Sequence, residues 1–391
     1  MTNEVLQKTA SDEQNVSLSN GLEPLPKLRF LEFKNTYKKT KLNEAVERIQ
    51  RRDPTSEAPV MMLSAASGFI MQSEKYSREN AGQSLKKYIL LRKGELAYNH
   101  GASKYKPFGC CFELKEDEAR IPYVYHCFAV KENNDKSYIA RLLNNQKIDQ
   151  QLKRLISSSV RMDGLLNISY EEYTGIDLYL PSLLEQQKIA DFLFLVDRRI
   201  EKQRQLVESL KKYKRGALSR VFNNVLETVK LSDISNFISS ARTLSTTLNG
   251  NKGIYPVYDA AGIAGYIDYY DIDSDYITIV KDGSGVGRLQ KCDKKSSFIG
   301  TLGALVAKNC TTDFLYAVLQ TIDFSKFVTG MAIPHIYYRD YKSTLLPFPS
   351  EEKQHFISQL LKKFDIYIEN ETQKLTNMLA YKQGLLQQMF I

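Results

Sequence analysis

The sequence predicts a mixed α+β fold in which two globular regions are each followed by one long helix. Three observations support this fold class: an internal duplication, a long stretch of helical periodicity at the end of each copy, and short β-prone runs before that stretch. The length of 391 residues is sufficient for two domains, each with a hydrophobic core.

The first long helix is predicted to begin at Pro181 and to extend for about forty residues, which corresponds to about 60 Å. Ser182 is suited to cap its amino end, with Glu185 three residues later to complete a capping box. Its apolar residues alternate in spacing between four and three, which produces one narrow apolar seam. They are Ile189, Leu193, Val196, Ile200, Val207, Leu210, Ala217 and Val221. Gln203 and Lys214 interrupt this seam, and a helix of this length needs a helical partner.

A second copy of this helix follows in the same chain. Pro349 lies 168 residues after Pro181, and the same offset matches both segments without a gap. The matched pairs include Gln186 with Gln354, Ile189 with Ile357, Leu193 with Leu361, Asp197 with Asp365, Gln203 with Glu371, Tyr213 with Tyr381, Lys214 with Lys382, Gly216 with Gly384 and Phe222 with Phe390. Because proline, glycine and aromatic positions match as well as the apolar period, we interpret this as a true duplication.

The globular regions show weaker but parallel patterns. Residues 1–25 are polar and are predicted to form a disordered tail. A short helix is expected to begin near Lys41, and its counterpart lies near Lys230. In the first region we predict strands at 88–91, 95–98 and 123–130 and a helix over 137–155. In the second we predict strands at 255–258, 266–269, 276–280 and 304–307 and a helix over 314–327. Both regions are therefore expected to be α+β.

The composition is moderately basic. There are 54 Lys and Arg against 45 Asp and Glu, which gives a net charge of +9. Such a surplus favours a polyanionic partner, although a protein that is merely basic is the alternative. The five cysteines form no CxxC pair and no ligand spacing with the four histidines, which is typical of free thiols in a reducing cytoplasm. No apolar run of about eighteen residues and no amino-terminal h-region is found, so we expect a cytoplasmic protein.

The chain lacks recognisable catalytic motifs. Residues 283–287 (GSGVG) do not fit the GxGxxG spacing and instead predict a tight turn or a phosphate-facing loop. No glycine precedes a lysine, so a P-loop is absent, and no proline precedes an aspartate, as it does in many nuclease sites. An Asn-Pro-Pro-Tyr adenine-methylation motif is also missing. The sequence therefore predicts that this chain is not itself an enzyme.

Three segments give the chain a family resemblance. They are residues 180–190 (LPSLLEQQKIA) at the start of the first helix, 330–336 (GMAIPHI) before the second, and 26–30 (PKLRF) at the entry to the first region. These segments and the order of the parts resemble the specificity subunits of type I restriction–modification systems. The resemblance covers nearly the whole chain from Pro26. It implies target-recognition domains at 26–180 and 225–348, and spacer helices at 181–224 and 349–391 that pack as an antiparallel coiled coil.

The resemblance also implies a mechanism and partners. Each target-recognition domain would read one half of a bipartite, asymmetric double-stranded DNA target, and the helices would set the spacer. Two modification (methyltransferase) subunits would dock on the helices, bind S-adenosylmethionine and flip out an adenine in each half-site. Two restriction (endonuclease and translocase) subunits would add ATP-driven translocation and cleavage with Mg²⁺. No cofactor and no membrane are expected for this chain.

Candidate DNA contacts lie in polar and basic loops, because phosphates attract Lys and Arg while base edges select polar side chains. In the first region they are Asn99, Ser103, Lys104, Tyr105, Lys106 and Arg161. In the second region they are Arg242, Lys252, Lys281, Ser284, Arg288 and Lys291. For any one of them, a solvated surface side chain is the alternative. Two other classes of function remain open: an enzyme that acts alone on DNA, and a coiled-coil scaffold with no DNA role.

Overall fold

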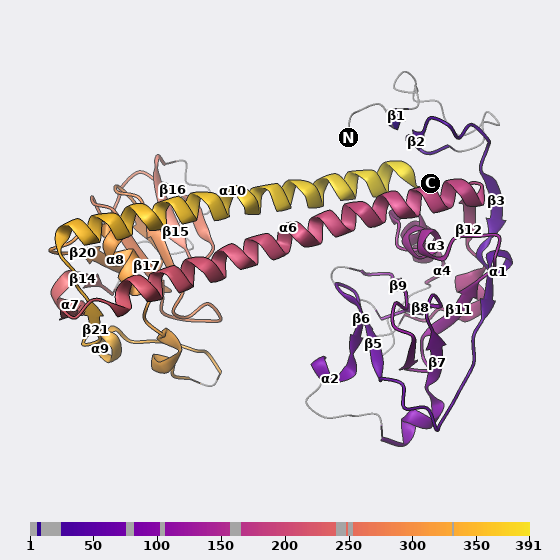
Figure 1. The fold of residues 1–391 in the computed structure, drawn as a ribbon, viewed down its shortest axis with the longest axis horizontal. Coiled ribbons are helices and arrows are strands. Elements are labelled where there is room, and N and C mark those ends of the chain that lie inside the picture. The colour runs from indigo at the N-terminus through magenta and orange to yellow at the C-terminus, as the bar shows by residue number, and fades with distance from the viewer. Residues whose placement is uncertain are drawn as a thin grey trace. The chain divides into compact units, whose positions relative to one another are not determined.

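The computed structural model describes residues 6–8, 25–75, 82–101, 106–156, 166–239, 248, 253–330 and 332–391. The chain divides into two compact units (Figure 1), each built around its own sheet. Unit 1 comprises residues 1–202 and 375–391, and unit 2 comprises residues 203–374. Among the helices in the described ranges, none has an apolar stretch long enough to cross a membrane.

A four-stranded antiparallel sheet forms the centre of unit 1. Its strand order is β4-β11-β8-β9, with bounds Val46–Arg48, His126–Val130, Leu96–Asn99 and Cys110–Glu113. Successive side chains of β8 enter different cores, as strand geometry requires: Leu96 and Tyr98 lie in one core, and Ala97 lies in another. The helices that contribute to the first core include α3 (Lys136–Leu142) and α4 (Gln146–Leu155).

Short strands surround the second core of unit 1. Two antiparallel pairs contribute to it, β5 (Met61–Ser64) with β6 (Gly68–Met71), and β7 (Ile89–Arg92) with β10 (Glu118–Ile121). The short helical segments α2 (Gln72–Lys75) and η1 (Gly82–Lys87) follow β6. Another strand, β1 (Leu6–Lys8), pairs with β2 (Leu28–Phe30), so the predicted disordered tail contains a short strand.

Unit 2 repeats the same central sheet. Its strand order is β14-β20-β17-β18, with bounds Ser235–Ile238, Leu302–Ala307, Tyr276–Val280 and Leu289–Cys292. The helical segments α8 (Thr312–Leu319) and η3 (Phe324–Phe327) supply Phe314 and Phe324 to its core. A second, three-stranded sheet has the order β16 (Gly262–Ile267), β15 (Tyr255–Asp259) and β19 (Ser297–Phe298).

A frame of matching elements supports each central sheet. In unit 1 it consists of β3 (Lys38–Lys41), α1 (Leu42–Ala45), α5 (Tyr170–Thr174) and β12 (Asp177–Leu180). In unit 2 it consists of β13 (Thr228–Lys230), α7 (Leu231–Ile234), α9 (Tyr338–Tyr341) and β21 (Leu345–Pro347). The backbone N–H of Leu42 donates to Ile176 and that of Leu231 donates to Thr344, both at 3.1 Å. The duplication therefore preserves individual hydrogen bonds.

The long helices are α6 (Leu183–Asn223) and α10 (Glu351–Met389), and within each unit their segments pack antiparallel. In unit 2 the Gln203 amide donates to the Glu371 carboxylate at 2.7 Å, and the Lys214 ammonium lies 2.6 Å from Asp365. In unit 1 the equivalent lysine and aspartate, Lys382 and Asp197, also lie 2.6 Å apart. Each polar residue that interrupts the apolar seam is thus paired with a polar residue of the other helix, which fixes the helix register.

The predicted α+β class with two long antiparallel helices is confirmed, but some local predictions were wrong. The helix expected over 137–155 is divided into α3 and α4, because Asn145 caps a new helix by accepting from the backbone N–H of Lys147. The helix expected over 314–327 likewise ends early, at Leu319. Ser182 does accept a hydrogen bond from the backbone N–H of Glu185, at 3.4 Å. The Glu185 side chain, however, does not complete a capping box.

Instead, Glu185 forms a buried ion pair between helix α6 and strand β2. Its two carboxylate oxygens accept from Nε and Nη2 of Arg29 at 2.7 and 2.8 Å, and the Tyr37 hydroxyl donates to the first of them at 3.1 Å. The side chains of Arg29 and Glu185 are 7% and 1% exposed. Because both charges are removed from water, each depends on the other for compensation.

Replacing Arg29 with alanine should therefore destabilise unit 1 strongly. Arg29→Ala leaves the Glu185 carboxylate buried without its main partner, so we expect a loss of about 3 kcal/mol in the free energy of unfolding, measured by urea titration. Lys39→Ala is the matched control, because it removes a cation from an exposed pair with Asp177 and should change little. Equal effects of the two substitutions would contradict a special role for the buried pair.

Candidate nucleic-acid interface

Equivalent β-hairpins in the two units carry many of the predicted DNA contacts. In unit 2 the hairpin β17–β18 is closed by residues 281–288, where the backbone N–H of Gly287 donates to Val280 at 2.9 Å. In unit 1 the hairpin β8–β9 holds the same place in the strand order, and the described residues between its strands are 100, 101 and 106–109. We call residues 281–288 hairpin loop 2 and these described residues hairpin loop 1. Described candidates from both regions therefore lie at or next to equivalent hairpins.

Hairpin loop 2 is a tight turn, as residues 283–287 predict. The backbone φ angles of Gly283 and Gly287 are +95° and +84°, a region that glycine enters without strain. A Cβ at Gly287 would also lie 2.8 Å from Cβ of Phe324, so this position requires glycine for two reasons. The glycine spacing already disfavours dinucleotide binding, and the structure disfavours it as well, because the loop leads into strand β18 rather than into a helix.

The predicted contacts of unit 2 divide into two groups. Lys281, Ser284 and Arg288 lie in hairpin loop 2, where Lys281 donates to the carbonyl of Ser239 at 2.8 Å. Lys291 lies beyond the loop, in strand β18. Its ammonium pairs with Asp313 of helix α8 rather than facing the loop. The Arg288 guanidinium donates to the carbonyl of Ala260. The first group therefore lies at the hairpin loop, whereas Lys291 is directed away from it. Arg242 and Lys252 lie outside the described residues.

In unit 1 two predicted contacts have structural partners. The Asn99 amide donates to the carbonyl of Leu63 at 3.2 Å and its oxygen accepts from the N–H of Gly101 at 2.9 Å. The Lys106 ammonium donates to the carbonyl of Asn144 at 3.0 Å. The other four predicted contacts lie outside the described residues; they are Ser103, Lys104, Tyr105 and Arg161.

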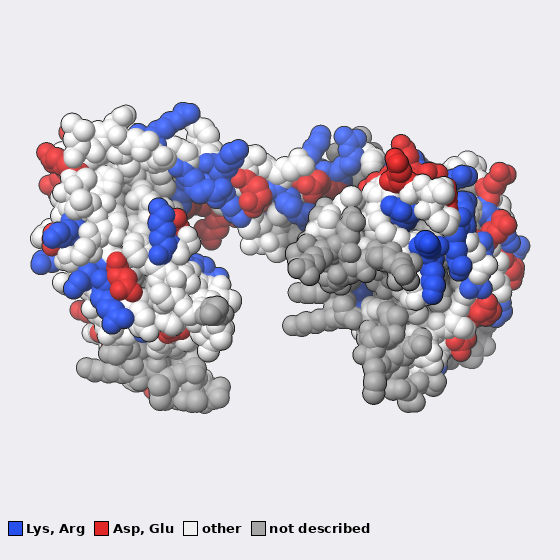
Figure 2. Space-filling model, turned by 90° about the horizontal axis from the view of Figure 1, so that it is seen from below, with Lys and Arg blue, Asp and Glu red and all other residues white. Residues whose placement is uncertain are grey.

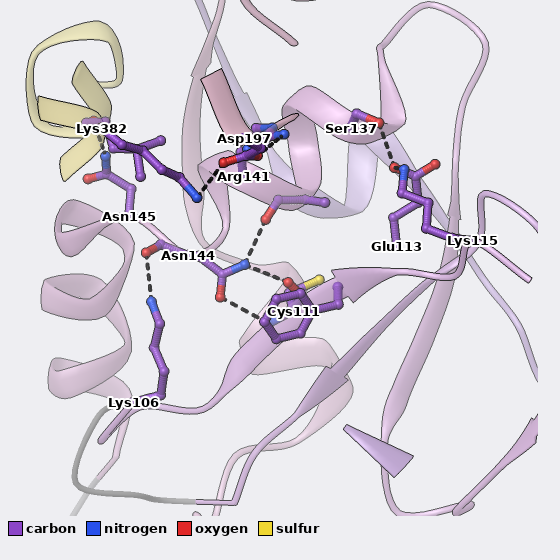
Figure 3. Close-up of a pocket in the computed structure, with 13 residues that line it drawn as sticks. Lys106, Cys111, Glu113, Lys115, Ser137, Arg141, Asn144, Asn145, Asp197 and Lys382 are labelled. Atoms are coloured by element: carbon purple, nitrogen blue, oxygen red, sulfur yellow. Dashed lines mark hydrogen bonds and ion pairs between the residues drawn. The ribbon is translucent and has the colours of Figure 1, made fainter. Parts of the chain in front are cut away.

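A pocket of about 360 Å³ next to Lys106 connects the sheet of unit 1 to the long helices (Figure 3). Its charges are paired: Asp197 lies 2.8 Å from Arg141 and 2.6 Å from Lys382, and Glu113 lies 2.6 Å from Lys115. The pairing joins α3, α6 and α10, so we interpret this pocket as a structural junction.

A second loop lies beside each hairpin loop. In unit 2 the backbone N–H of Gly283 donates to Pro334 at 2.9 Å, and that of Ile336 donates to Lys281 at 3.0 Å. In unit 1 the backbone N–H of Leu166 donates to His100, which is in hairpin loop 1, at 2.9 Å. The 330–336 segment, which carries part of the family resemblance, is therefore adjacent to predicted DNA contacts.

A pocket that the sequence did not indicate lies beside hairpin loop 2. This pocket of about 400 Å³ is lined by Phe237, Ser239, Lys281, Asp282, Ile336, Tyr337, Tyr338 and Arg339. The Arg339 guanidinium lies 4.7 Å from the centre of the exposed Tyr337 ring. Only the position of the 330–336 segment could have indicated Tyr337 and Arg339, since they follow it directly in the sequence.

Basic side chains are spread over the surface. On the face drawn in Figure 2, Lys and Arg occur on both units together with Asp and Glu and with neutral surface. A continuous basic surface is not seen on the described part of that face.

The buried titratable groups are not activated for catalysis. Burial raises the pKa of the thiols of Cys110, Cys292 and Cys310 to about 11, which keeps them protonated and weakly nucleophilic. Burial, and then the neighbouring His100, lower the pKa of His126 to about 4. Its Nε2 lies 3.1 Å from the carbonyl oxygen of Ile168 and therefore carries a proton as donor. The described residues contain no cluster of His, Cys, Asp and Glu that could hold a metal ion.

His126 should make unit 1 sensitive to acid. The folded state holds this imidazole neutral down to a pKa of about 4, whereas the unfolded chain binds a proton near pH 6.5. Its contribution to stability is therefore complete above pH 6.5 and is lost as the pH falls from 6.5 to about 4. Between pH 7 and pH 5 we expect a loss of about 2 kcal/mol in the free energy of unfolding that His126→Gln lacks. Parallel pH dependence of both proteins in urea titrations would contradict this.

Comparisons with known proteins agree with this geometry. Residues 224–379 match the family model of the type I restriction modification DNA specificity domain. The chain is 29% identical over 151 residues to a type I specificity subunit of Mycoplasma pneumoniae, which covers 37% of this chain and 49% of that protein. It is 27% identical over 115 residues to the specificity subunit of the type I restriction enzyme EcoprrI of Escherichia coli, which covers 29% and 28%. The match thus spans about half the length of the first relative and less of the second.

Solved structures share the fold over most of the chain. The crystal structure of a type I restriction–modification S subunit from M. genitalium has a TM-score of 0.57 at 15% identity, covering 94% of this chain and 99% of that one. A chain from a study of complex assembly and conformational transition of the type I restriction–modification system has a TM-score of 0.54 at 16% identity, covering 90% and 97%. The solved structures show that the fold is shared. Together with the partial matches to the family model and to the two relatives, they agree with the resemblance to the specificity subunits of type I restriction–modification systems.

Proposed function

We propose that this chain is the non-catalytic DNA-specificity subunit of a type I restriction–modification complex, and that each globular region reads one half of a bipartite target. One observation carries the proposal: the same hairpin recurs at the same sheet position in both units, but its loop sequence differs. The shared frame positions both globular regions in the same way relative to their helices, while different loop side chains select different bases.

The long helices are proposed to set the spacer and to dock two modification subunits. Helix α6 has 41 residues and α10 has 39, so each is about 60 Å long. Both helices also expose large apolar side chains, which are typical of surfaces that bind a protein partner. These include Leu184, Phe194, Leu195, Tyr213, Phe356, Ile366, Tyr367 and Tyr381.

Catalysis is assigned to the partners. The modification subunits would bind S-adenosylmethionine, and two restriction subunits would use ATP and Mg²⁺. This chain would bind double-stranded DNA in the cytoplasm and hold no cofactor. An enzyme acting alone on DNA is disfavoured because the chain has no methyl-donor or nucleotide motif. Methyl transfer by the isolated chain would revive that alternative.

Exchange of one globular region tests the proposal. Replacing residues 30–165 with the counterpart from another family member should change one half of the methylated motif and leave the other half unchanged, because unit 2 and both long helices remain. The motif is measured by methylation sequencing of cells that also express the modification subunit. The reciprocal exchange, of residues 231–333, should change only the other half. A simultaneous change of both halves in either experiment would refute two separate readers.

Hairpin loop 2 can be tested by salt titration. Arg288→Ala should weaken DNA binding by the assembled complex and, for a phosphate contact, reduce the slope of log affinity against log salt by about one. If Arg288 reads a base, the loss should be about 1–3 kcal/mol and confined to the cognate sequence. Lys291→Ala removes the same charge from a side chain already paired with Asp313 and should have a smaller effect. Unchanged affinity and slope for Arg288→Ala would exclude Arg288 as a DNA contact. Absence of salt-dependent DNA binding by the parent complex would favour a scaffold with no DNA role.

A further inference from the structure

Arg48 and Phe237 occupy the same position in the two units. Arg48 ends strand β4 and pairs with Phe128 of β11, whereas Phe237 lies in β14 and pairs with Leu305 of β20. They are separated by 189 residues, the offset that also relates helices α1 and α7. The frame therefore presents two different side chains at one place.

Each of these side chains stacks on an equivalent tyrosine. The Arg48 guanidinium lies 4.4 Å from the centre of the Tyr170 ring, and the Phe237 ring lies 4.3 Å from that of Tyr338, at an interplanar angle of 8°. Tyr170 and Tyr338 are 168 residues apart and begin helices α5 and α9. We call Tyr170 and Tyr338 the tyrosine platforms. The duplication has thus kept the tyrosine and changed the side chain that stacks on it.

The platforms adjoin the hairpin loops. In unit 2 both Phe237 and Lys281, the latter from hairpin loop 2, pack over Gly303. A Cβ added at Gly303 would lie 2.6 Å from the Phe237 ring and 3.3 Å from Cδ of Lys281. In unit 1 the same strand position holds His126, whose ring meets Tyr170 edge-on at 5.8 Å and lies 5.0 Å from the ring of His100 in hairpin loop 1. A DNA segment in contact with either loop would therefore be close to the stacked group.

The two groups differ in what they can recognise. The Arg48 side chain is 46% exposed, and Glu171 holds one end of its guanidinium at 3.1 Å. An arginine oriented in this way can donate two parallel hydrogen bonds to O6 and N7 of guanine. Phe237 is half-buried at the edge of the pocket beside hairpin loop 2, and an aromatic ring makes apolar contact with the thymine methyl group.

We propose that Arg48 and Phe237 are matched specificity-determining residues, with Arg48 selecting a guanine in the half-site of unit 1 and Phe237 selecting a thymine in that of unit 2. This inference rests on the proposed function and names residues that carry it. The tyrosine beneath each group acts as a positioning residue, because it holds the group flat beside the loop.

The test is the methylated motif of the complex with its modification subunit, measured for the parent and for single variants. Arg48→Ala should relax one guanine position by roughly 5- to 150-fold in relative methylation rate, which corresponds to about 1–3 kcal/mol. All other positions should be unchanged. Phe237→Ala should relax one thymine position in the other half-site only. Lys39→Ala is the matched control for Arg48→Ala, because it removes one cation from an ion pair with Asp177 and should leave the motif unchanged.

Two conservative variants separate a loss of base recognition from a loss of folding. Arg48→Lys keeps the charge but loses the planar fork, so it should relax the guanine position while thermal unfolding stays close to that of the parent. Phe237→Tyr keeps the ring and should retain the thymine preference. A bipartite parent motif that is identical in Arg48→Lys and Arg48→Ala would overturn the inference but leave the proposed function intact. A parent complex without a bipartite motif would overturn both.

Discussion

The contact between helices α6 and α10 is the constraint on which the rest of the structure depends. Each unit contains a segment of both helices, so neither core is complete without the partner segment. In unit 1, Ile189 and Leu193 of α6 pack in one core with Met389 and Phe390 from the end of the chain. In unit 2 the corresponding core contains Ile357 and Leu361 of α10 beside Leu218 and Phe222 of α6.

The stability of unit 1 therefore depends on the packing of Met389 and Phe390. Burial of a side chain such as Met389 or Phe390 contributes about 1.5–3 kcal/mol, and the Phe390 ring also lies 5.2 Å from that of Tyr138 in helix α3. Apolar contacts along the seam stabilise the helix pair, whereas the polar pairs fix its register. Lys214 with Asp365, and Lys382 with Asp197, are each matched across the duplication, so a shifted register would separate both ion pairs. The frame can then remain constant while surface loops change freely.

Much of this organisation could be predicted from the sequence because it is periodic. The apolar period predicted the seam, and the 168-residue offset predicted the matching positions of its polar interruptions. The same offset relates Tyr173 to Tyr341, both of which are fully buried. What could not be predicted depends on contacts between distant residues. Arg48 reaches Tyr170 only through the fold, and Arg29 competes successfully for the carboxylate that would have completed a capping box.

Candidate site residues were predicted only in part for the same reason. Polar and basic composition selected Lys281, Ser284 and Arg288 as candidates, and they lie in one turn because they are neighbours in sequence. It could not distinguish Lys291, whose ammonium is directed to Asp313 of helix α8 by its position in strand β18. The half-buried tyrosine platforms Tyr170 and Tyr338 carry no local signal, because tyrosines are common throughout this sequence. Their recurrence at a fixed offset becomes informative only when the strands place Arg48 and Phe237 above them.

The most direct test of this account shortens both helices together. Deleting residues 203–209 and 371–377 removes one heptad from each helix, so the seam and the outer register are retained while each helix loses about 10 Å. DNA rises 3.4 Å per base pair, so the account predicts a methylated motif whose spacer is shorter by about three base pairs and whose half-sites are unchanged. A folded, active complex that methylates a motif with the original spacer would contradict it.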